Sequence, residues 1–244
     1  MDKIYQEKIF INSNDVDDHY DLKISTIFKY LQQVSTNHSE LLGLGMKSTV
    51  DRGMFWVITR MHVKILKMPK MLETLTVTTH PGDLMMFIFP RFYEVYNELG
   101  ELCITASAAW VLLDINTHKV VTKPLEDGYE YKGTSLPEDL PLPNRVIYDD
   151  NLAKVENRTV RYGDIDLNGH LNNTKYIDYI IDTHDIHFYK KYRVNEILIN
   201  YEKEINDGDS VDIFTSGNNP EVIVGDVNGT HSFSAKVTYE NRDD

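Results

Sequence analysis

The segment Val160–Tyr176, VRYGDIDLNGHLNNTKY, decides how the rest of the chain is interpreted. Within it, Asp166, Asn168 and His170 occupy alternate positions after a strand-like run, residues 158–162. An extended backbone places alternate side chains on one face, so we expect this carboxylate, amide and imidazole to lie side by side. Such a group of polar side chains predicts a catalytic or binding site.

Two asparagines follow, directly before a run with helical period. The side chains of Asn172 and Asn173 are suited to capping a helix N-terminus, so a helix is predicted from about residue 173. Polar groups at a helix N-terminus stabilise negative charge. The segment therefore combines acid–base side chains with a place for a developing oxyanion.

The same residues also fit two simpler structures. Asn168-Gly169 is typical of tight hairpin turns, and the polar residues would then only build a turn. The spacing Asp164-x-Asp166-x-Asn168 matches the start of an EF-hand calcium loop, which requires a bidentate Glu at its twelfth position. Lys175 occupies that position, which argues against calcium, and we predict no metal site.

The composition is that of a soluble globular protein. Hydrophobic residues make up 41% and charged residues 26% of the 244 residues, and runs such as Leu84–Phe89 are too short to cross a bilayer. The formal net charge of −13 argues against partners such as nucleic acid or an anionic membrane surface. Because Cys103 is the only cysteine and the N-terminus does not resemble a signal peptide, we expect a cytoplasmic protein.

The chain contains two copies of one plan: a strand, a polar turn, a helix and four further strands. In the first copy the helix is predicted at about residues 24–42, with strands at 9–14, 55–67, 74–80, 87–96 and 104–114. In the second copy the helix is predicted at about 173–189, with strands at 158–162, 196–205, 210–216, 222–227 and 231–239. Asp15-Val16-Asp17 matches Asp164-Ile165-Asp166 at an offset of 149.

This duplication predicts an α+β fold of two tandem hotdog domains, each a curved antiparallel sheet wrapped around a long central helix. We expect the first domain at residues 1–132, a proline-containing linker at 133–150 and the second domain at 151–244. The alternative is two unrelated α+β modules.

The sequence DIDLNGHLNNTKYIDY, residues 164–179, resembles the active-site segment of the acyl-acyl carrier protein thioesterases of bacterial type. Residues 55–61 and 109–114 resemble strands of that family's N-terminal domain. The resemblance implies hydrolysis of fatty acyl thioesters of acyl carrier protein, which releases free fatty acid and terminates fatty acid synthesis. It also implies that the first domain binds the acyl chain and the second is catalytic.

Position by position, the family's catalytic Asp, Asn and His fall on Asp166, Asn168 and His170. Its catalytic Glu falls on Glu204, 34 positions after His170. Plant members carry a Cys directly after this Glu, whereas this chain has Ile205. A cysteine nucleophile is therefore not expected.

Thioester hydrolysis requires an activated water, a polarised carbonyl and stabilisation of the oxyanion. Our hypothesis makes Glu204 the general base and has Asn168 orient the water. His170 would polarise the carbonyl or protonate the leaving thiolate, with its tautomer fixed by Asp166. Exchange of the base role among Glu204, His170 and Asp166 stays open. Strand alternation also requires a bulge or a strand end before Glu204, if it is to face the site.

The resemblance implies acyl carrier protein as the partner and no cofactor beyond the phosphopantetheine on the substrate. Candidate residues for binding the acyl chain are Phe28, Leu31, Phe55 and Val57, while Asn172 and Asn173 are candidates for binding near the carbonyl. The turn of the first copy, residues 15–19, has acids and a His but no match to the Asn and His of the motif, which indicates a degenerate site. Formation of a homodimer is left open.

Other charged clusters have simpler explanations. His184 and His187 share a helix face but lack further ligands, so a solvated helix end is favoured over a metal site. Two basic clusters are candidates for docking an acidic carrier protein: Lys64, Lys67 and Lys70, and Lys190, Lys191 and Arg193. Competing functions are hydrolysis of acyl-coenzyme A, non-catalytic sensing of acyl thioesters, and hotdog dehydration.

Overall fold

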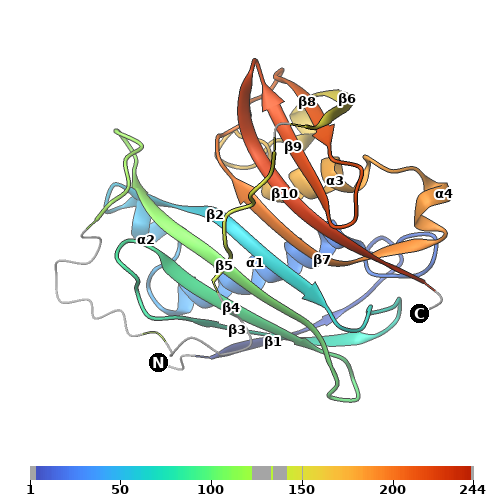
Figure 1. The fold of residues 1–244 in the computed structure, drawn as a ribbon. Coiled ribbons are helices and arrows are strands. Elements are labelled where there is room, and N and C mark those ends of the chain that lie inside the picture. Colours follow the sequence, from blue (N-terminus) through green and yellow to red (C-terminus); the bar gives the residue numbers. More distant parts are fainter. Residues whose placement is uncertain (1–3, 123–132, 134–141, 150, 243–244) are drawn as a thin grey trace. The chain divides into compact units, whose positions relative to one another are not determined.

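The computed structural model describes residues 4–122, 133, 142–149 and 151–242 (Figure 1). The chain divides into two compact units, Met1–Pro143 and Asn144–Asp244. Most of the expected linker, including Pro137 and Pro141, lies outside the described residues. The boundaries expected from the sequence at 132 and 151 stay a prediction.

The first unit is an antiparallel sheet packed against one long helix. Its strands lie in the order β1-β3-β4-β5-β2. Helix α1 covers one face of this sheet (Figure 1). The elements are β1 (Tyr5–Phe10), α1 (Ile24–Leu41), α2 (Met46–Val50), β2 (Met54–Ile65), β3 (Thr74–Pro81), β4 (Phe89–Tyr96) and β5 (Leu102–Asp114).

Its core follows from two periodicities in the sequence. Phe28, Leu31 and Val34 are spaced three apart on α1 and are fully buried. Along β3 buried residues alternate with partly exposed ones, which places Leu75 and Val77 beneath the helix. The helix-on-sheet core of the first copy is therefore as predicted.

The second unit repeats this architecture with a shorter helix. Its strands lie in the order β7-β10-β9-β8-β6, again all antiparallel. The elements are β6 (Ala153–Thr159), the 3₁₀ turn η1 (Tyr162–Asp164), α3 (Asn173–Ile181), α4 (Ile186–Tyr189), β7 (Tyr192–Tyr201), β8 (Ser210–Thr215), β9 (Glu221–Val227) and β10 (Thr230–Asn241). Tyr176 of α3 packs edge-on against the rings of Tyr201 and Phe233. Gly225 leaves room for the Phe233 ring, because a Cβ there would come within 1.9 Å of it.

The helix predicted over residues 173–189 is wrong in its second half. Helix α3 ends at Ile181, and the side chain of Asp185 starts a new short helix by accepting the N–H groups of His187 and Phe188, both at 3.0 Å. An Asp in this place competes with continuation of the first helix, since it caps the next one.

The first strand of each copy lies further upstream than predicted, at residues 5–10 and 153–159. The cause is the same in both copies. The Asp15 carboxylate accepts the Asn12 N–H at 3.1 Å, and the Asp164 carboxylate accepts the Arg161 N–H at 3.1 Å. Each Asp thereby closes a turn, which takes the chain out of the sheet before the polar segment.

A buried carboxylate links the end of α3 to the sheet of the second unit. Glu221 is 2% exposed, and its Oε2 lies 2.7 Å from His184 Nε2, while Thr215 donates to its other oxygen. The His184 ring stacks on Phe188 with ring centroids 3.8 Å apart. His184 is thus a structural partner of Glu221. The described residues contain no group of three metal-binding side chains.

We expect His184→Ala to destabilise the second unit by roughly 2–3 kcal/mol, because the Glu221 carboxylate would stay buried without this partner. Urea unfolding followed by far-UV circular dichroism measures the change. The matched control is His187→Ala, an exposed residue on the next helix, which should change the free energy of unfolding by less than about 0.5 kcal/mol. Equal losses for the two variants would contradict this role of His184.

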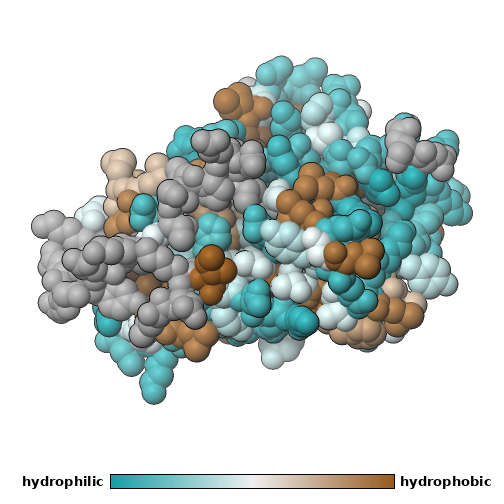
Figure 2. All heavy atoms as spheres, turned by 90° about the horizontal axis from the view of Figure 1, so that it is seen from below, coloured by the Kyte–Doolittle hydropathy of each residue, from teal (hydrophilic) through white to brown (hydrophobic). Residues whose placement is uncertain are grey.

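The surface is mixed in polarity. On the face drawn in Figure 2, the hydrophobic residues that are coloured gather in small patches separated by hydrophilic ones. Scattered exposed hydrophobic residues of this kind are common in folded proteins. None of the described helices is long and apolar enough to cross a membrane.

Candidate active site

The motif residues form a tight turn. Ile165 and Leu171 pair across it, and the Asp166 N–H donates to the His170 carbonyl at 2.8 Å. Gly169 has a φ of +86°, in the left-handed region that glycine adopts without strain. The expected alignment of alternate side chains on an extended backbone is therefore wrong, and the hairpin-turn interpretation describes the backbone.

The Asp166 carboxylate explains this turn. Its Oδ1 accepts the N–H of Asn168 at 2.8 Å and that of His170 at 3.3 Å, which is the local pattern of an Asx turn. Among the described residues, no hydrogen bond joins this carboxylate to the His170 ring. The contact by which Asp166 was expected to fix the imidazole tautomer is thus replaced by a contact to the backbone.

Glu204 supplies the partner of the imidazole. Its Oε2 lies 3.3 Å from His170 Nε2, and the two side chains are 42% and 27% exposed. Strand β7 ends at Tyr201, so Glu204 lies on the loop beyond it, which satisfies the expected strand end. The loop is joined to the motif turn by a 2.7 Å bond from the Leu171 N–H to the Ile205 carbonyl. Two segments distant in sequence therefore form one His–Glu pair open to solvent.

Two further motif side chains differ in their contacts: Asn168 is exposed, and Asn172 caps helix α3. Asn168 is exposed, and its side chain makes no hydrogen bond to the described residues. The Asn172 Oδ1 accepts both the N–H and the hydroxyl of Thr174, at 2.9 and 2.8 Å, and so caps α3 as predicted. Its oxygen is thus engaged in the cap, and binding of substrate by Asn172 stays a prediction.

One backbone donor is left at the start of α3. The N–H groups of Leu171, Asn172, Thr174 and Lys175 all have acceptors within the second unit. The Asn173 N–H has no acceptor among the described residues, and it lies at the positive end of the helix. It is the candidate donor to an oxyanion.

The site contains the groups for water activation and none for covalent catalysis by cysteine. Ile205 is fully buried, directly after Glu204. Cys103 is buried in the first unit, where burial raises the pKa of its thiol and disfavours the thiolate. A carboxylate in contact with an imidazole can take a proton from water and pass one on, which suits general acid–base catalysis.

The four candidates for acyl-chain binding do not share one surface. Phe28 and Leu31 are fully buried in the core between α1 and the sheet. Phe55 and Val57 alternate with Trp56, whose Nε1 donates to the Leu44 carbonyl just after α1, so they face away from the helix. Phe55 and Val57 therefore lie on the other face of the sheet from Phe28 and Leu31, and binding of the acyl chain by any of the four stays a prediction. The alternation around Trp56 is the sequence signal that would have placed them.

The first unit repeats the backbone frame of the motif turn. Asp17 N–H donates to the Asp21 carbonyl at 2.9 Å, and Asp17 Oδ1 accepts the N–H groups of His19 and Asp21 at 2.9 and 3.0 Å. Leu22 N–H then donates to the Pro69 carbonyl at 2.9 Å, as Leu171 does in the second unit. The two copies thus share their turn and its attachment to a strand end.

The chemistry of the two copies differs. Asp21 takes the place of His170 and pairs with Lys70, with 2.5 Å between Oδ1 and Nζ. Met68 takes the place of Glu204, because each lies three residues after the end of its strand. The first unit therefore keeps the frame and lacks the His–Glu pair.

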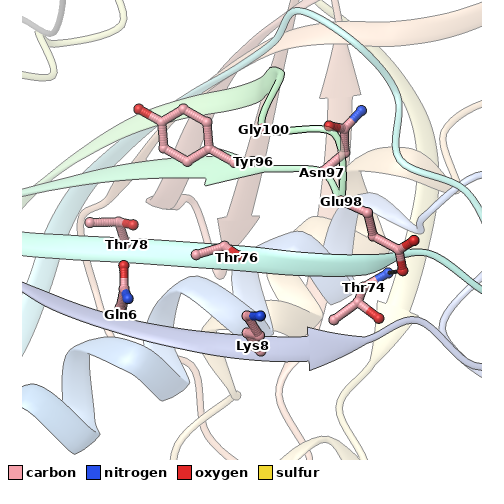
Figure 3. A pocket seen from close by; sticks show the side chains of 9 residues that line it. All are labelled: Gln6, Lys8, Thr74, Thr76, Thr78, Tyr96, Asn97, Glu98 and Gly100. Atoms are coloured by element: carbon pink, nitrogen blue, oxygen red, sulfur yellow. Dashed lines mark hydrogen bonds between the residues drawn. The ribbon is translucent and has the colours of Figure 1, made fainter.

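A pocket of 530 Å³ lies on the first unit, apart from the motif. Figure 3 shows three threonines in a row on β3 beside side chains of β1 and β4. The lining residues are Gln6, Lys8, Thr74, Thr76, Thr78, Tyr96, Asn97, Glu98 and Gly100. Such a polar lining does not suit an acyl chain.

Two family models match the chain. The model of the acyl-ACP thioesterase N-terminal domain matches residues 2–128, and that of the C-terminal domain matches residues 148–242. The chain belongs to the acyl-ACP thioesterase family. The resemblance inferred from the motif is confirmed, and membership places the chain among thioester hydrolases.

Relatives with known names are distant in sequence and close in structure. The chain is 24% identical to oleoyl-acyl carrier protein thioesterase 2, chloroplastic, of Arabidopsis thaliana, over 98% of this chain and 70% of that protein. It is 25% identical to a palmitoyl-acyl carrier protein thioesterase of the same plant and spans about half of its length, 52%. A solved acyl-ACP thioesterase of Bacteroides thetaiotaomicron is 25% identical over 98% of both chains, with a TM-score of 0.90. The fold is accordingly the predicted pair of hotdog domains.

The hydrogen bonds of Asp166 suggest a test of whether its charge or its contacts to the turn matter for activity. Because its oxygen holds backbone N–H groups, Asp166→Asn should keep the turn and retain kcat/KM within about 5-fold, whereas Asp166→Ala should lower it by more than about 10-fold. Steady-state kinetics on an acyl-ACP substrate measures both. If Asn is as harmful as Ala, the charge of Asp166 matters more than its hydrogen bonds to the turn.

Proposed function

We propose that this chain hydrolyses fatty acyl thioesters of acyl carrier protein to free fatty acid and carrier protein, and so terminates fatty acid synthesis. The observation that carries the proposal is the solvent-accessible pair of His170 and Glu204, 3.3 Å apart beside the start of α3, in a member of this family. The proposal includes a cytoplasmic location and no cofactor other than the pantetheine arm of the substrate.

In the proposed reaction, water attacks the thioester carbonyl without a covalent enzyme intermediate. Glu204 accepts a proton from the water, and the Asn168 amide orients that water. The resulting oxyanion lies at the Asn173 N–H. When the C–S bond breaks, His170 passes a proton to the departing thiolate. The products are a fatty acid and the free thiol of the carrier.

The contact between Glu204 and His170 also permits the reverse assignment, with His170 as base and Glu204 holding the imidazole. Both assignments require the pair to be intact. The two assignments predict different effects of Glu204→Gln on activity. Gln can hold an imidazole by a hydrogen bond but cannot accept a proton from water.

We expect Glu204→Gln to lower kcat by about 10²–10⁴-fold with little change in KM, since general-base catalysis contributes about that much. Single-turnover hydrolysis of an acyl-ACP measures the chemical step. The control is Glu202→Gln, the same substitution on the same loop, where the carboxylate accepts from Ser234 at 2.7 Å and not from His170. A Glu204→Gln enzyme within a few-fold of wild type would assign the base role to another group.

The two basic clusters bear on whether the acyl carrier is a protein. In the first basic cluster, Lys67 pairs with Glu101 and Lys70 with Asp21, so these charges are already compensated. Lys190 and Lys191 at the end of α4 are exposed and form no ion pair with the described residues. Arg193 of the second cluster pairs with Glu240, so Lys190 and Lys191 are the better candidates for meeting an acidic carrier protein.

We expect Lys191→Glu to raise KM for acyl-ACP by about 5-fold and to raise KM for the same acyl group on coenzyme A by less, because a carrier protein presents a more extended acidic surface than the phosphates of coenzyme A. Lys119→Glu, an exposed lysine of the first unit, is the control. A wild-type enzyme that prefers the coenzyme A substrate would favour the acyl-coenzyme A thioesterase. A wild-type chain that hydrolyses neither substrate would overturn the enzyme proposal in favour of a sensor.

A further inference from the structure

Asp164 ties the base of the motif turn to the start of α3. Its carbonyl accepts the Asn172 N–H at 2.8 Å, so the turn between them is closed at its base. Its N–H donates to the Arg161 carbonyl at 2.8 Å, and its Oδ2 accepts the Arg161 N–H at 3.1 Å. The residue thus fixes the chain on both sides of its own position.

The Asp164 side chain is held in turn by helix α3. The hydroxyl of Tyr179, seven residues beyond the cap, interacts with this carboxylate, and Lys175 Nζ lies 3.9 Å from its Oδ1 and 3.3 Å from Asp178 Oδ2. The Tyr179 side chain is 4% exposed, and the Arg158 guanidinium lies 5.0 Å above its ring. Burial, followed by the Asp164 charge, raises the pKa of Tyr179 to about 12, so the hydroxyl stays a donor at neutral pH.

The first unit contains the same device at an offset of 149. Asp15 accepts the Asn12 N–H with its carboxylate and the Lys23 N–H with its carbonyl, at 3.1 and 2.9 Å. Tyr30, 6% exposed, interacts with the Asp15 carboxylate. The turn that this pair holds carries no His–Glu pair.

Two cations distinguish the copy that holds the site. The positions of Lys175 and Arg158 are occupied by Thr26 and Ile9 in the first unit. At these two positions the second copy has cations near its Asp–Tyr pair, and the first copy has neutral residues. Lys175 also pairs with Asp178, and Arg158 also pairs with Glu156 and Asp182.

We propose that Asp164 and Tyr179 are positioning residues that set His170 against Glu204. This inference rests on the proposed function. The far end of the turn is joined to the Glu204 loop through the Leu171 N–H, and the near end is held by Asp164. If the near end loosens, His170 moves relative to Glu204, and small misplacements of reacting groups lower the rate of the chemical step.

The test compares Tyr179→Phe with Tyr30→Phe, which removes the same hydroxyl from the copy without the His–Glu pair. Tyr179→Phe should lower kcat by about 5–20-fold with KM within about 2-fold. Tyr30→Phe should keep the wild-type kcat and lower the melting temperature by a similar amount. Asp164→Asn, which keeps an acceptor for Tyr179 and for the Arg161 N–H, should retain more activity than Asp164→Ala. Wild-type kcat in Tyr179→Phe, or equal losses in both Phe variants, overturns the inference.

Amide hydrogen exchange gives a readout independent of turnover. Tyr179→Phe should speed exchange in residues 165–172 and Tyr30→Phe in residues 16–23, each without affecting the other turn. Unchanged exchange at 165–172 in Tyr179→Phe overturns the positioning role. If the wild-type chain hydrolyses no acyl thioester, the proposed function fails while the exchange result still decides whether this pair holds the turn.

Discussion

The candidate site depends on one main-chain hydrogen bond, from the Leu171 N–H to the Ile205 carbonyl at 2.7 Å. It joins the motif turn before α3 to the loop after β7. Without it, nothing in the local sequence would bring His170 to Glu204, which lies 34 positions further along the chain. Because both partners of the bond are backbone groups, it places few demands on side chains. The side chains that surround it are then available for chemistry.

The first unit has the same turn and the same main-chain bond without a His–Glu pair at the matching positions. The equivalent bond runs from Leu22 to Pro69 at 2.9 Å, yet Asp21, paired with Lys70, takes the place of His170, and Met68 takes the place of Glu204. The same turn thus carries an ion pair in the first unit and the His170–Glu204 pair in the second. The duplicated strand, turn and helix supply the scaffold, and the two copies differ in the side chains at its end, where among the described residues only the second copy has a His–Glu pair.

The helices and strands could be predicted from the sequence where hydrophobic periodicity is continuous. Helix α1 ends within one residue of its predicted end, since a continuous apolar stripe and a following glycine define it. The helix of the second copy was misjudged because Asp185 interrupts a pattern that otherwise continues. The strand starts were misjudged because Asp15 and Asp164 close turns through their side chains, a local competition that hydrophobic periodicity does not register.

For the site, the sequence indicated which motif residues come together but not their geometry. Asp166, Asn168 and His170 are found in one short segment, but their geometry depends on an Asx turn and not on strand alternation. The position of Glu204 came from the family resemblance alone. In the second copy the turn matches the first at an offset of 149, whereas Glu204 matches Met68 at 136, mainly because α3 has 9 residues and α1 has 18. A constant repeat distance therefore cannot find the acid.

The residue after Glu204 supports the proposal that hydrolysis proceeds without a thiol nucleophile. Ile205 is fully buried, and its carbonyl holds the motif turn, while the neighbouring Glu204 side chain is 42% exposed and directed at His170. Successive residues on this extended loop thus face opposite ways. A side chain at position 205 packs into the core of the second unit, and only its backbone contributes to the site. A nucleophile at that position would have to leave the core, so the proposed chemistry rests on Glu204, His170 and water.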